Sequence, residues 1–253
     1  MHHPQRRTVE VLGTPIDAVD WDTALGRIDA WARTRESRYV CICNAHSLVT
    51  AAGQAGFARV LQGADMTTPD GAPVAWMLRR LGVAGQQRIN GPDLMLHYCG
   101  LAERSGVGVY LFGSTWATLA TLQSGLHQRF PTLHIAGSFS PPFRESTIAE
   151  DQAQIAAINS SGAGVVFVSL GCPKQELWMA ARRGQVQAVM VGVGAAFDFH
   201  AGTILRAPSW MRKAGLEWLH RLLQEPRRLW RRYLVTNTLF ILRAARQLLF
   251  GRP

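Results

Sequence analysis

Short, unbroken apolar runs alternate with segments of helical periodicity along most of the chain. The runs predict strands over Thr8–Leu12, Tyr39–Cys43, Val107–Phe112, Leu133–Ala136, Gly164–Leu170 and Ala188–Val193. Apolar residues at helical spacing predict helices over Trp21–Thr34, His46–Gly63, Gly71–Leu81, Pro92–Arg104, Trp116–Arg129, Thr147–Ser160 and Gln175–Arg182. Strands of continuous Val, Ile and Leu character are typical of a parallel sheet covered by helices on both faces. The pattern therefore predicts an α/β domain with a Rossmann-like parallel sheet over residues 1–205.

Residues 206–253 differ from this domain in charge and in pattern. The whole chain carries 27 Lys and Arg against 17 Asp and Glu, a formal net charge of +10. The last 48 residues hold eleven of the basic residues and only two Glu, so +9 of that charge lies there. Arginines alternate with apolar residues, with Trp and Tyr among them, which is typical of an amphipathic helix on an anionic membrane surface. A packed terminal helix with a solvated Arg face is the alternative interpretation.

Five residues at junctions between strands and helices mark the candidate site. They are Asn44, Asp70, Gly113, Gln175 and Asp198. Ligands of parallel α/β sheets bind where strands end and helices begin. We therefore expect Asn44, Asp70 and Gln175 to converge on one cleft.

Each of these motifs also has a purely structural interpretation. The segment 67–71 (TTPDG) suits a tight turn or a helix N-cap, although a carboxylate at a strand end also suits a general base. The segment 171–176 (GCPKQE) suits a strand-to-helix turn or an anion site at a helix N-terminus. The pair Asp20 and Asp22 resembles a metal-binding D-x-D pattern, but its position before a helix favours capping.

The four cysteines indicate no disulfide framework and no zinc site. Cys41 and Cys43 are two apart on a predicted strand and so share a face, and no CxxC spacing occurs. Reduced thiols in a cytosolic protein are the simplest interpretation.

Taken together, eight motifs resemble the WecG/TagA/CpsF family of bacterial glycosyltransferases. The resemblance extends from about Val9 to Tyr233. Its motifs are Asn44 with His46, PDG at 69–71, RINGPDL at 88–94, GCPKQE at 171–176, GVGAAFDFHAG at 192–202, RAPSW at 206–210, GLEWLHRL at 215–222 and EPRRLWRRY at 225–233. Each motif alone is a weak signal, whereas their order and spacing together are specific.

The resemblance implies an inverting, metal-independent glycosyltransferase that needs no cofactor. Its donor is a UDP-sugar, and its acceptor is a sugar linked to undecaprenyl diphosphate, in cell-surface polysaccharide biosynthesis. The family therefore implies a cytoplasmic protein, peripheral on the inner face of the cell membrane, and self-association into a homo-oligomer. N-acetylmannosamine, N-acetylmannosaminuronic acid and glucose are all compatible with the family as the transferred sugar.

The resemblance also assigns roles to individual residues. Asp70 matches the catalytic base, and Asn44 and Gln175 match polar residues near the reacting sugar. Further substrate-binding residues are expected at Arg88 and Asp198 in their motifs, and in the tail at Arg221, Arg228 and Arg231. The tail arginines are expected to hold the diphosphate, because guanidinium groups pair with phosphate in a bidentate manner. Ile42 stands where some members have threonine, which leaves the choice of donor open.

Two other functions are compatible with the composition. The first is nucleic-acid binding, which the net positive charge allows. Because the sequence contains no known nucleic-acid-binding motif, we expect no nucleic-acid partner. A non-catalytic module that binds a sugar nucleotide is the other alternative. Salt-dependent binding of DNA would favour the first, and binding of UDP without turnover would favour the second.

Overall fold

Six parallel strands form the central sheet in the computed structural model, which describes residues 6–251. They are β3 (Arg38–Cys43), β4 (Met66–Pro69), β5 (Val109–Gly113), β6 (Ile135–Phe139), β7 (Val165–Ser169) and β8 (Val189–Gly192). Their order across the sheet is β4-β3-β8-β7-β5-β6, and each neighbouring pair is parallel. The carboxyl ends of all six strands therefore lie along one edge, and the predicted parallel α/β fold is confirmed.

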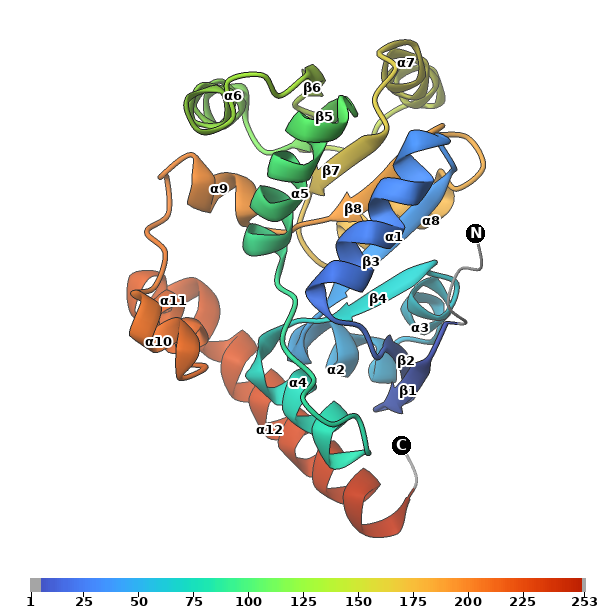
Figure 1. Ribbon diagram of the computed structural model, residues 1–253. Helices are drawn as coiled ribbons and strands as arrows, with labels where there is room; N and C mark the ends of the chain where they lie inside the picture. The colour runs from blue at the N-terminus through green and yellow to red at the C-terminus, as the bar shows by residue number, and fades with distance from the viewer. Residues whose placement is uncertain (1–5, 252–253) are drawn as a thin grey trace.

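Helices cover both faces of this sheet (Figure 1). One face packs against α1 (Trp21–Arg33), α5 (Gly91–Ser105), α6 (Trp116–Arg129) and α9 (Ala196–His200). The other packs against α2 (Ala45–Gly53), α3 (Ala55–Gln62), α7 (Ile148–Ser160) and α8 (Lys174–Ala181). Side chains alternate between the two faces along each strand. In β3, Val40 and Ile42 join the first core, while Cys41 and Cys43 join the second, as the sequence predicts.

An antiparallel hairpin of β1 (Thr8–Val11) and β2 (Thr14–Asp17) precedes the sheet. The expected strand over Thr8–Leu12 is confirmed as β1, which ends one residue earlier, but the sequence analysis missed β2. Leu12 and Gly13 form the two-residue turn, with φ of 52° and 78°. Two positive φ values give a turn whose twist matches that of the paired strands, so the chain reverses at once. The buried carboxylate of Asp17 then accepts a hydrogen bond from the backbone N–H of Thr67 at 2.7 Å, which fastens the hairpin to β4.

Two further strands differ from the prediction. The segment 67–71 was expected to be a turn, but its first three residues belong to β4, which pairs with β3 at the edge of the sheet. The expected strand over Leu133–Ala136 is displaced to β6, two to three residues later. Both strands are short, and a four- or five-residue strand has too few side chains to show a period of two in the sequence.

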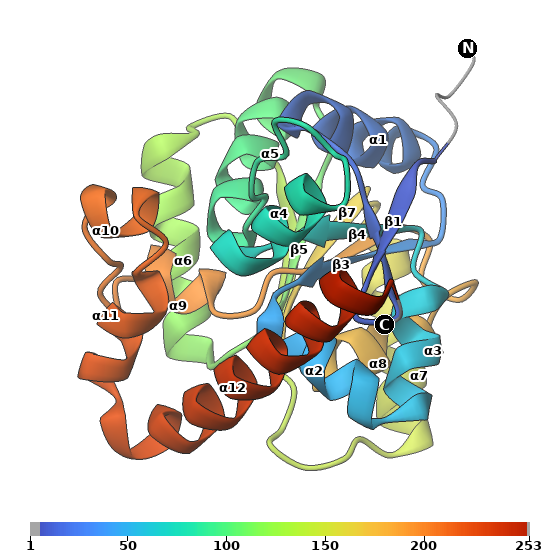
Figure 2. The same cartoon turned by 90° about the horizontal axis from the view of Figure 1, so that it is seen from below.

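The basic segment forms α10 (Ser209–Lys213), α11 (Glu217–Gln224) and α12 (Pro226–Phe250). The remaining helix of the sheet domain, α4 (Gly71–Arg80), follows β4. Figure 2 shows α12 running past α2 toward the β1–β2 hairpin. Leu229, Phe240 and Ala244 are buried on its inner side. Gln247 accepts a hydrogen bond from the Leu12 N–H at 3.0 Å and donates one to the Glu10 carbonyl at 2.7 Å. The helix is thus both packed and amphipathic. Among residues 6–251, no helix has the length and apolar character needed to cross a membrane.

Candidate active site

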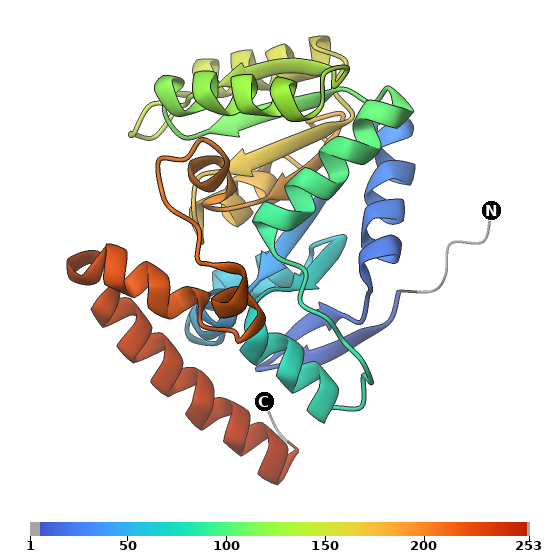
Figure 3. The same ribbon diagram turned by 60° about the vertical axis from the view of Figure 1, so that its left-hand side comes forward.

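A cavity of about 790 Å³ lies where the strands of the main sheet end. Its walls include the residues that directly follow β3, β4, β5, β7 and β8, which are Asn44, Asp70, Ser114, Leu170 and Val193. Residues of α11 and α12 line the other side, and Figure 3 shows α10, α11 and α12 grouped on one side of the body. Asn44, Asp70 and Gln175 therefore converge on one cleft, as the sequence predicts. The cavity wall thus combines residues at the carboxyl edge of the sheet with arginine side chains from α11 and α12.

Asp70 occupies the N-cap position of α4, yet its carboxylate makes no capping hydrogen bond. Its backbone N–H donates to the Cys43 carbonyl at 2.8 Å, which holds the residue beside the end of β3. Burial raises the pKa of Asp70 to about 6, and the nearby Glu217 carboxylate adds to the rise, whereas Arg88 and the Gly71 N–H oppose it. A carboxyl group that is not used for capping and titrates near neutrality suits a general base.

An ion-pair network joins three of the motifs around Asp70. Arg88 donates to Glu217 at 2.9 Å, and Arg206 donates to Asp93 at 2.6 and 2.9 Å and to Glu217 at 3.4 Å. Burial opposes ionisation of Asp93, but hydrogen bonds from Arg206 and Asn90 lower its pKa to about 2. The network fastens the start of α11 to the segment before α5. Glu217, which the sequence analysis did not single out, thus fixes the position of Arg88.

Asn44 and Gln175 both use their side-chain oxygens within the protein. Asn44 caps α2, where its Oδ1 accepts hydrogen bonds from the backbone N–H groups of His46 and Ser47 at 3.0 and 3.2 Å. Gln175 is buried; its Oε1 accepts from the Gly194 N–H at 3.1 Å, and its Nε2 donates to Glu176 at 2.9 Å. Asn44 therefore keeps both N–H groups of its amide for a ligand, and Gln175 keeps one N–H and one lone pair of its oxygen.

Asp198 belongs to α9, which follows β8, and it lines the cavity beside Ser114, which follows β5. Its carboxylate accepts a hydrogen bond from the Ser114 hydroxyl at 3.5 Å. Burial raises the pKa of Asp198, while Ser114 and the charges of Arg221 and Arg228 oppose the rise. Arg221 lies over the Phe199 ring at 5.4 Å, and Arg228 pairs with Glu225 at 2.6 Å. Two of the three expected tail arginines, Arg221 and Arg228, therefore line the cavity.

Gly113 itself does not line the cavity; it permits close packing next to it. A Cβ atom at Gly113 would lie 2.3 Å from the carbonyl oxygen of Ser169, and the residue has a φ of 125°. Only glycine fits this junction, and the following Ser114 and Thr115 are thereby placed in the cavity wall.

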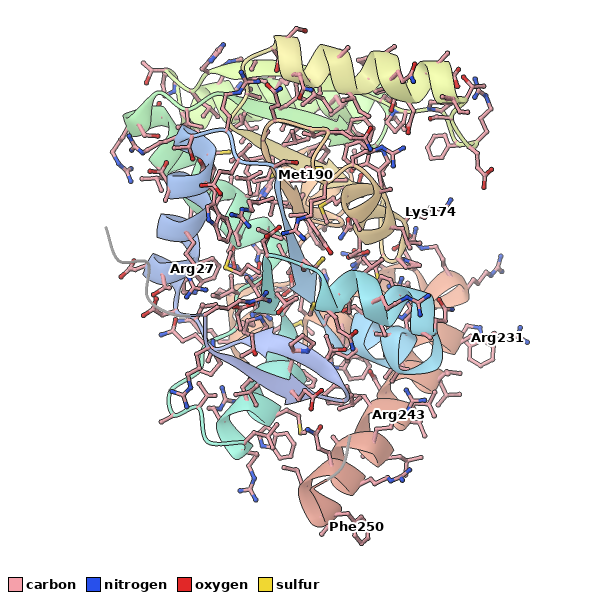
Figure 4. The ribbon with its side chains drawn as sticks, turned by 90° about the vertical axis from the view of Figure 1, so that its right-hand side faces the viewer. Arg27, Lys174, Met190, Arg231, Arg243 and Phe250 are labelled. Atoms are coloured by element: carbon pink, nitrogen blue, oxygen red, sulfur yellow. The ribbon has the colours of Figure 1, made fainter. Side chains whose placement is uncertain are left out.

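Besides Gly113, Arg231 is the expected site residue that the structure places outside the cavity wall. It is exposed, and Figure 4 shows its side chain directed away from the body. The next residue, Arg232, lines the cavity instead. One residue corresponds to about 100° of helix rotation, so Arg228 and Arg232 share a side of α12, whereas Arg231 does not. Helical spacing from Arg228 is the signal that identifies Arg232 in the sequence.

The sequence analysis did not single out three other residues that line the cavity, namely Glu176, Trp218 and Tyr233. Ile42, which stands where some family members have threonine, lines the cavity near the end of β3. Asp20 caps α1 by accepting a hydrogen bond from the Thr23 N–H at 2.8 Å, as the capping interpretation predicts. Within residues 6–251, no group of three or more His, Cys, Asp or Glu side chains is placed to hold a metal ion.

A polar cleft at the carboxyl edge of a parallel sheet, with a half-buried carboxyl and several arginines, suits a phosphorylated ligand. Residues 9–253 match the model of the Glycosyl transferase WecG/TagA/CpsF family. The chain belongs to this family, so the predicted family and enzyme class are confirmed. A relative from Bacillus spizizenii (strain ATCC 23059 / NRRL B-14472 / W23), N-acetylglucosaminyldiphosphoundecaprenol N-acetyl-beta-D-mannosaminyltransferase, is 36% identical over 177 residues. The alignment covers 69% of this chain and 66% of the relative, just under two thirds of its length.

Proposed function

We propose that this protein transfers N-acetylmannosamine from its UDP derivative to N-acetylglucosamine carried on undecaprenyl diphosphate. The relative's name gives this acceptor and this transferred sugar, and the family match covers almost all of the chain. N-acetylmannosaminuronic acid and glucose are the alternative sugars to be tested as donors. Membership of a glycosyltransferase family favours catalysis over nucleic-acid binding and over a non-catalytic binding module.

The reaction that we propose is a single displacement with inversion at the sugar. The acceptor hydroxyl oxygen forms a bond to the anomeric carbon while the bond from that carbon to the diphosphate oxygen breaks. Asp70 accepts the hydroxyl proton, and UDP leaves with the electron pair. Attack from the face opposite UDP inverts the anomeric configuration, and one carboxylate suffices for it. The observation that carries the proposal is a carboxyl with a pKa of about 6 in the same cavity as Arg88, Arg221 and Arg228.

In this proposal, arginines stabilise the leaving group without a divalent ion. UDP gains negative charge as the glycosidic bond breaks, and guanidinium groups bind phosphate oxygens in pairs. Arg221 and Arg228 line the same cavity as Asp198 and Ser114, and their charges act on Asp198. Asn44 and Gln175 then contribute amide N–H groups beside the reacting sugar.

The direct test is a transfer assay with a short-chain prenyl-diphosphate acceptor. Full-length protein is incubated with UDP-N-acetylmannosamine, UDP-N-acetylmannosaminuronic acid or UDP-glucose, and the product is detected by mass spectrometry. We expect transfer from UDP-N-acetylmannosamine, with turnover changed less than about twofold by EDTA, because the cations are part of the chain. Absence of transfer from all three donors would refute the activity, whereas loss of turnover in EDTA would refute only its independence of metal.

We further propose that the protein acts as a peripheral protein on an anionic membrane surface. Large apolar side chains of α12 are exposed, including Trp230, Leu234, Ile241 and Leu242, and arginines lie among them. We expect the protein to co-sediment with vesicles that contain phosphatidylglycerol but not with neutral phosphatidylcholine vesicles. Replacing Leu234 and Ile241 together by glutamate should abolish sedimentation. If the wild-type protein and the double variant bound equally to vesicles with and without phosphatidylglycerol, the proposal would be contradicted.

A further inference from the structure

Two arginines in the cavity wall have no carboxylate partner within the described residues. Arg88 and Arg228 each pair with a glutamate, whereas Arg221 and Arg232 form no ion pair in residues 6–251. The Nε atoms of Arg221 and Arg232 are buried and make no hydrogen bond there. A partly buried guanidinium without an anion is unfavourable, because its charge loses hydration and gains no compensation. Both positions are therefore suited to an anionic ligand.

The two arginines act on different parts of the cavity. Arg221 lies over Phe199, and its charge is felt by Asp198. The charge of Arg232 is felt by His46 and Cys172 instead. Arg232 is also four residues beyond Arg228, which places it about 6 Å further along the helix axis. The cavity wall thus has two separate positively charged regions, one at Arg221 and Arg228 and one at Arg232.

The surroundings of Arg232 supply further groups for a phosphorylated sugar. The His46 ring Nδ1 lies 3.4 Å from the Thr236 hydroxyl, and its Nε2 has no hydrogen bond to any residue of the described range. Tyr233 lies under the Arg232 guanidinium at 5.5 Å and forms an edge-to-face pair with Trp218 at 5.8 Å. These side chains all line the cavity. They combine a cation, polar hydrogen-bonding groups and an aromatic surface, which suits a sugar joined to a diphosphate.

The proposed reaction involves two diphosphates, one in UDP and one in the acceptor. We infer that Arg232, with His46 and Thr236, binds the diphosphate of the lipid-linked acceptor, separately from the UDP diphosphate at Arg221 and Arg228. This inference rests on the proposed function. The assignment follows from the position of Arg232: Leu234 and Val235, which follow it on α12, are exposed. A prenyl chain attached to this diphosphate therefore reaches an apolar exterior, which UDP does not need.

The test compares two substitutions in the soluble, short-chain transfer assay. Arg232→Gln should raise the KM for the acceptor roughly tenfold or more, because it removes charge-assisted hydrogen bonds. It should leave the KM for the UDP-sugar and the calorimetric Kd of UDP within about twofold. Arg221→Gln should show the reverse pattern. Arg227 is exposed on the same helix and lies outside the cavity. Arg227→Gln removes the same charge, and it should change neither the two KM values nor the Kd of UDP.

Direct binding keeps this inference separate from the activity. If the wild-type protein transfers no sugar, calorimetric titration with the short-chain acceptor still decides the assignment. A tenfold loss of acceptor affinity in Arg232→Gln supports it, and an unchanged affinity overturns it. Equal weakening of UDP and acceptor binding in Arg232→Gln also overturns it, even when the wild-type protein is active. Should Arg232→Gln fold poorly, Arg232→Lys retains the charge but not the bidentate geometry, and it should weaken acceptor binding selectively.

Discussion

The substitution Asp70→Asn is expected to lower kcat by roughly 10²–10⁴-fold, the usual contribution of a general base. Asparagine has nearly the same shape, but it cannot accept the proton of the acceptor hydroxyl. Because the Asp70 side chain makes no capping bond to α4, the substitution removes no such contact from the fold. Kd values for UDP should therefore stay close to those of the wild-type protein. Undiminished turnover in Asp70→Asn would contradict the assignment of the base.

The same substitution should not destabilise the protein. The pKa of Asp70 in the folded protein is about 6, above the ordinary value of 3.8. A raised pKa means that the folded state favours the protonated carboxyl, so this contribution to stability is present at low pH and is lost as the pH rises through about 6. At pH 7 the ionised group therefore opposes folding, by roughly 1–3 kcal/mol. Asp70→Asn removes this penalty, and we expect an unchanged or higher Tm in calorimetry.

A pH profile checks the same carboxyl by another route. The value of kcat/KM should fall about tenfold per pH unit below about pH 6, because the base must be ionised. Glu217 raises the pKa of Asp70 and also pairs with Arg88. Glu217→Gln removes a negative charge, so it should lower the pKa of Asp70 and move the acidic limb to lower pH. A limb that stays in place in both Glu217→Gln and Asp70→Asn would assign it to another group.

The substitution Phe240→Ala is expected to have the largest effect on stability. Phe240 is 4% exposed and packs with the core on the α2 side of the sheet. Truncation of a buried phenylalanine costs about 3–5 kcal/mol, from lost burial and the cavity that remains. Because Arg228 and Arg232 lie on the same helix, transfer should fall together with the Tm.

An exposed residue of the same helix provides the matched control. Leu242 is 61% exposed, so Leu242→Ala should change the free energy of unfolding by less than about 0.5 kcal/mol. Thermal unfolding followed by circular dichroism and the transfer assay with a soluble acceptor measure both effects. If Phe240→Ala retains the wild-type Tm and turnover, packing of α12 on α2 is not what holds the arginines over the cavity.

The fold was largely predictable because most of its strands are buried on both faces. The strands β3, β5, β7 and β8 are apolar except for Arg38 and Ser169 at their ends, and that pattern distinguishes a covered parallel sheet from other arrangements. The hairpin partner β2 and the edge strand β4 were missed. Their four-residue sequences contain Thr and Pro, and only pairing with a neighbouring strand identifies them as strands.

The candidate site was predictable where its residues follow strands, and less so in the tail. Asn44 and Asp70 were expected in one cleft because parallel strands bring their carboxyl ends to a common edge. In the tail, the sequence offers many arginines of equal chemistry. The start of α12 at Pro226 and its packing through Leu229 decide which of them face inward. Arg232 therefore lines the cavity and Arg231 does not.

The sequence by itself determined the class of fold, the family and the identity of the candidate base, since these depend on local patterns and on the order of short motifs. Only the tertiary structure decided the raised pKa of Asp70, its link through Arg88 to Glu217, and the orientation of α12. Each of these depends on segments that are more than 100 residues apart and meet only when the tail packs against the sheet domain. Burial and electrostatic interactions act across such contacts, and no local pattern in the sequence records them.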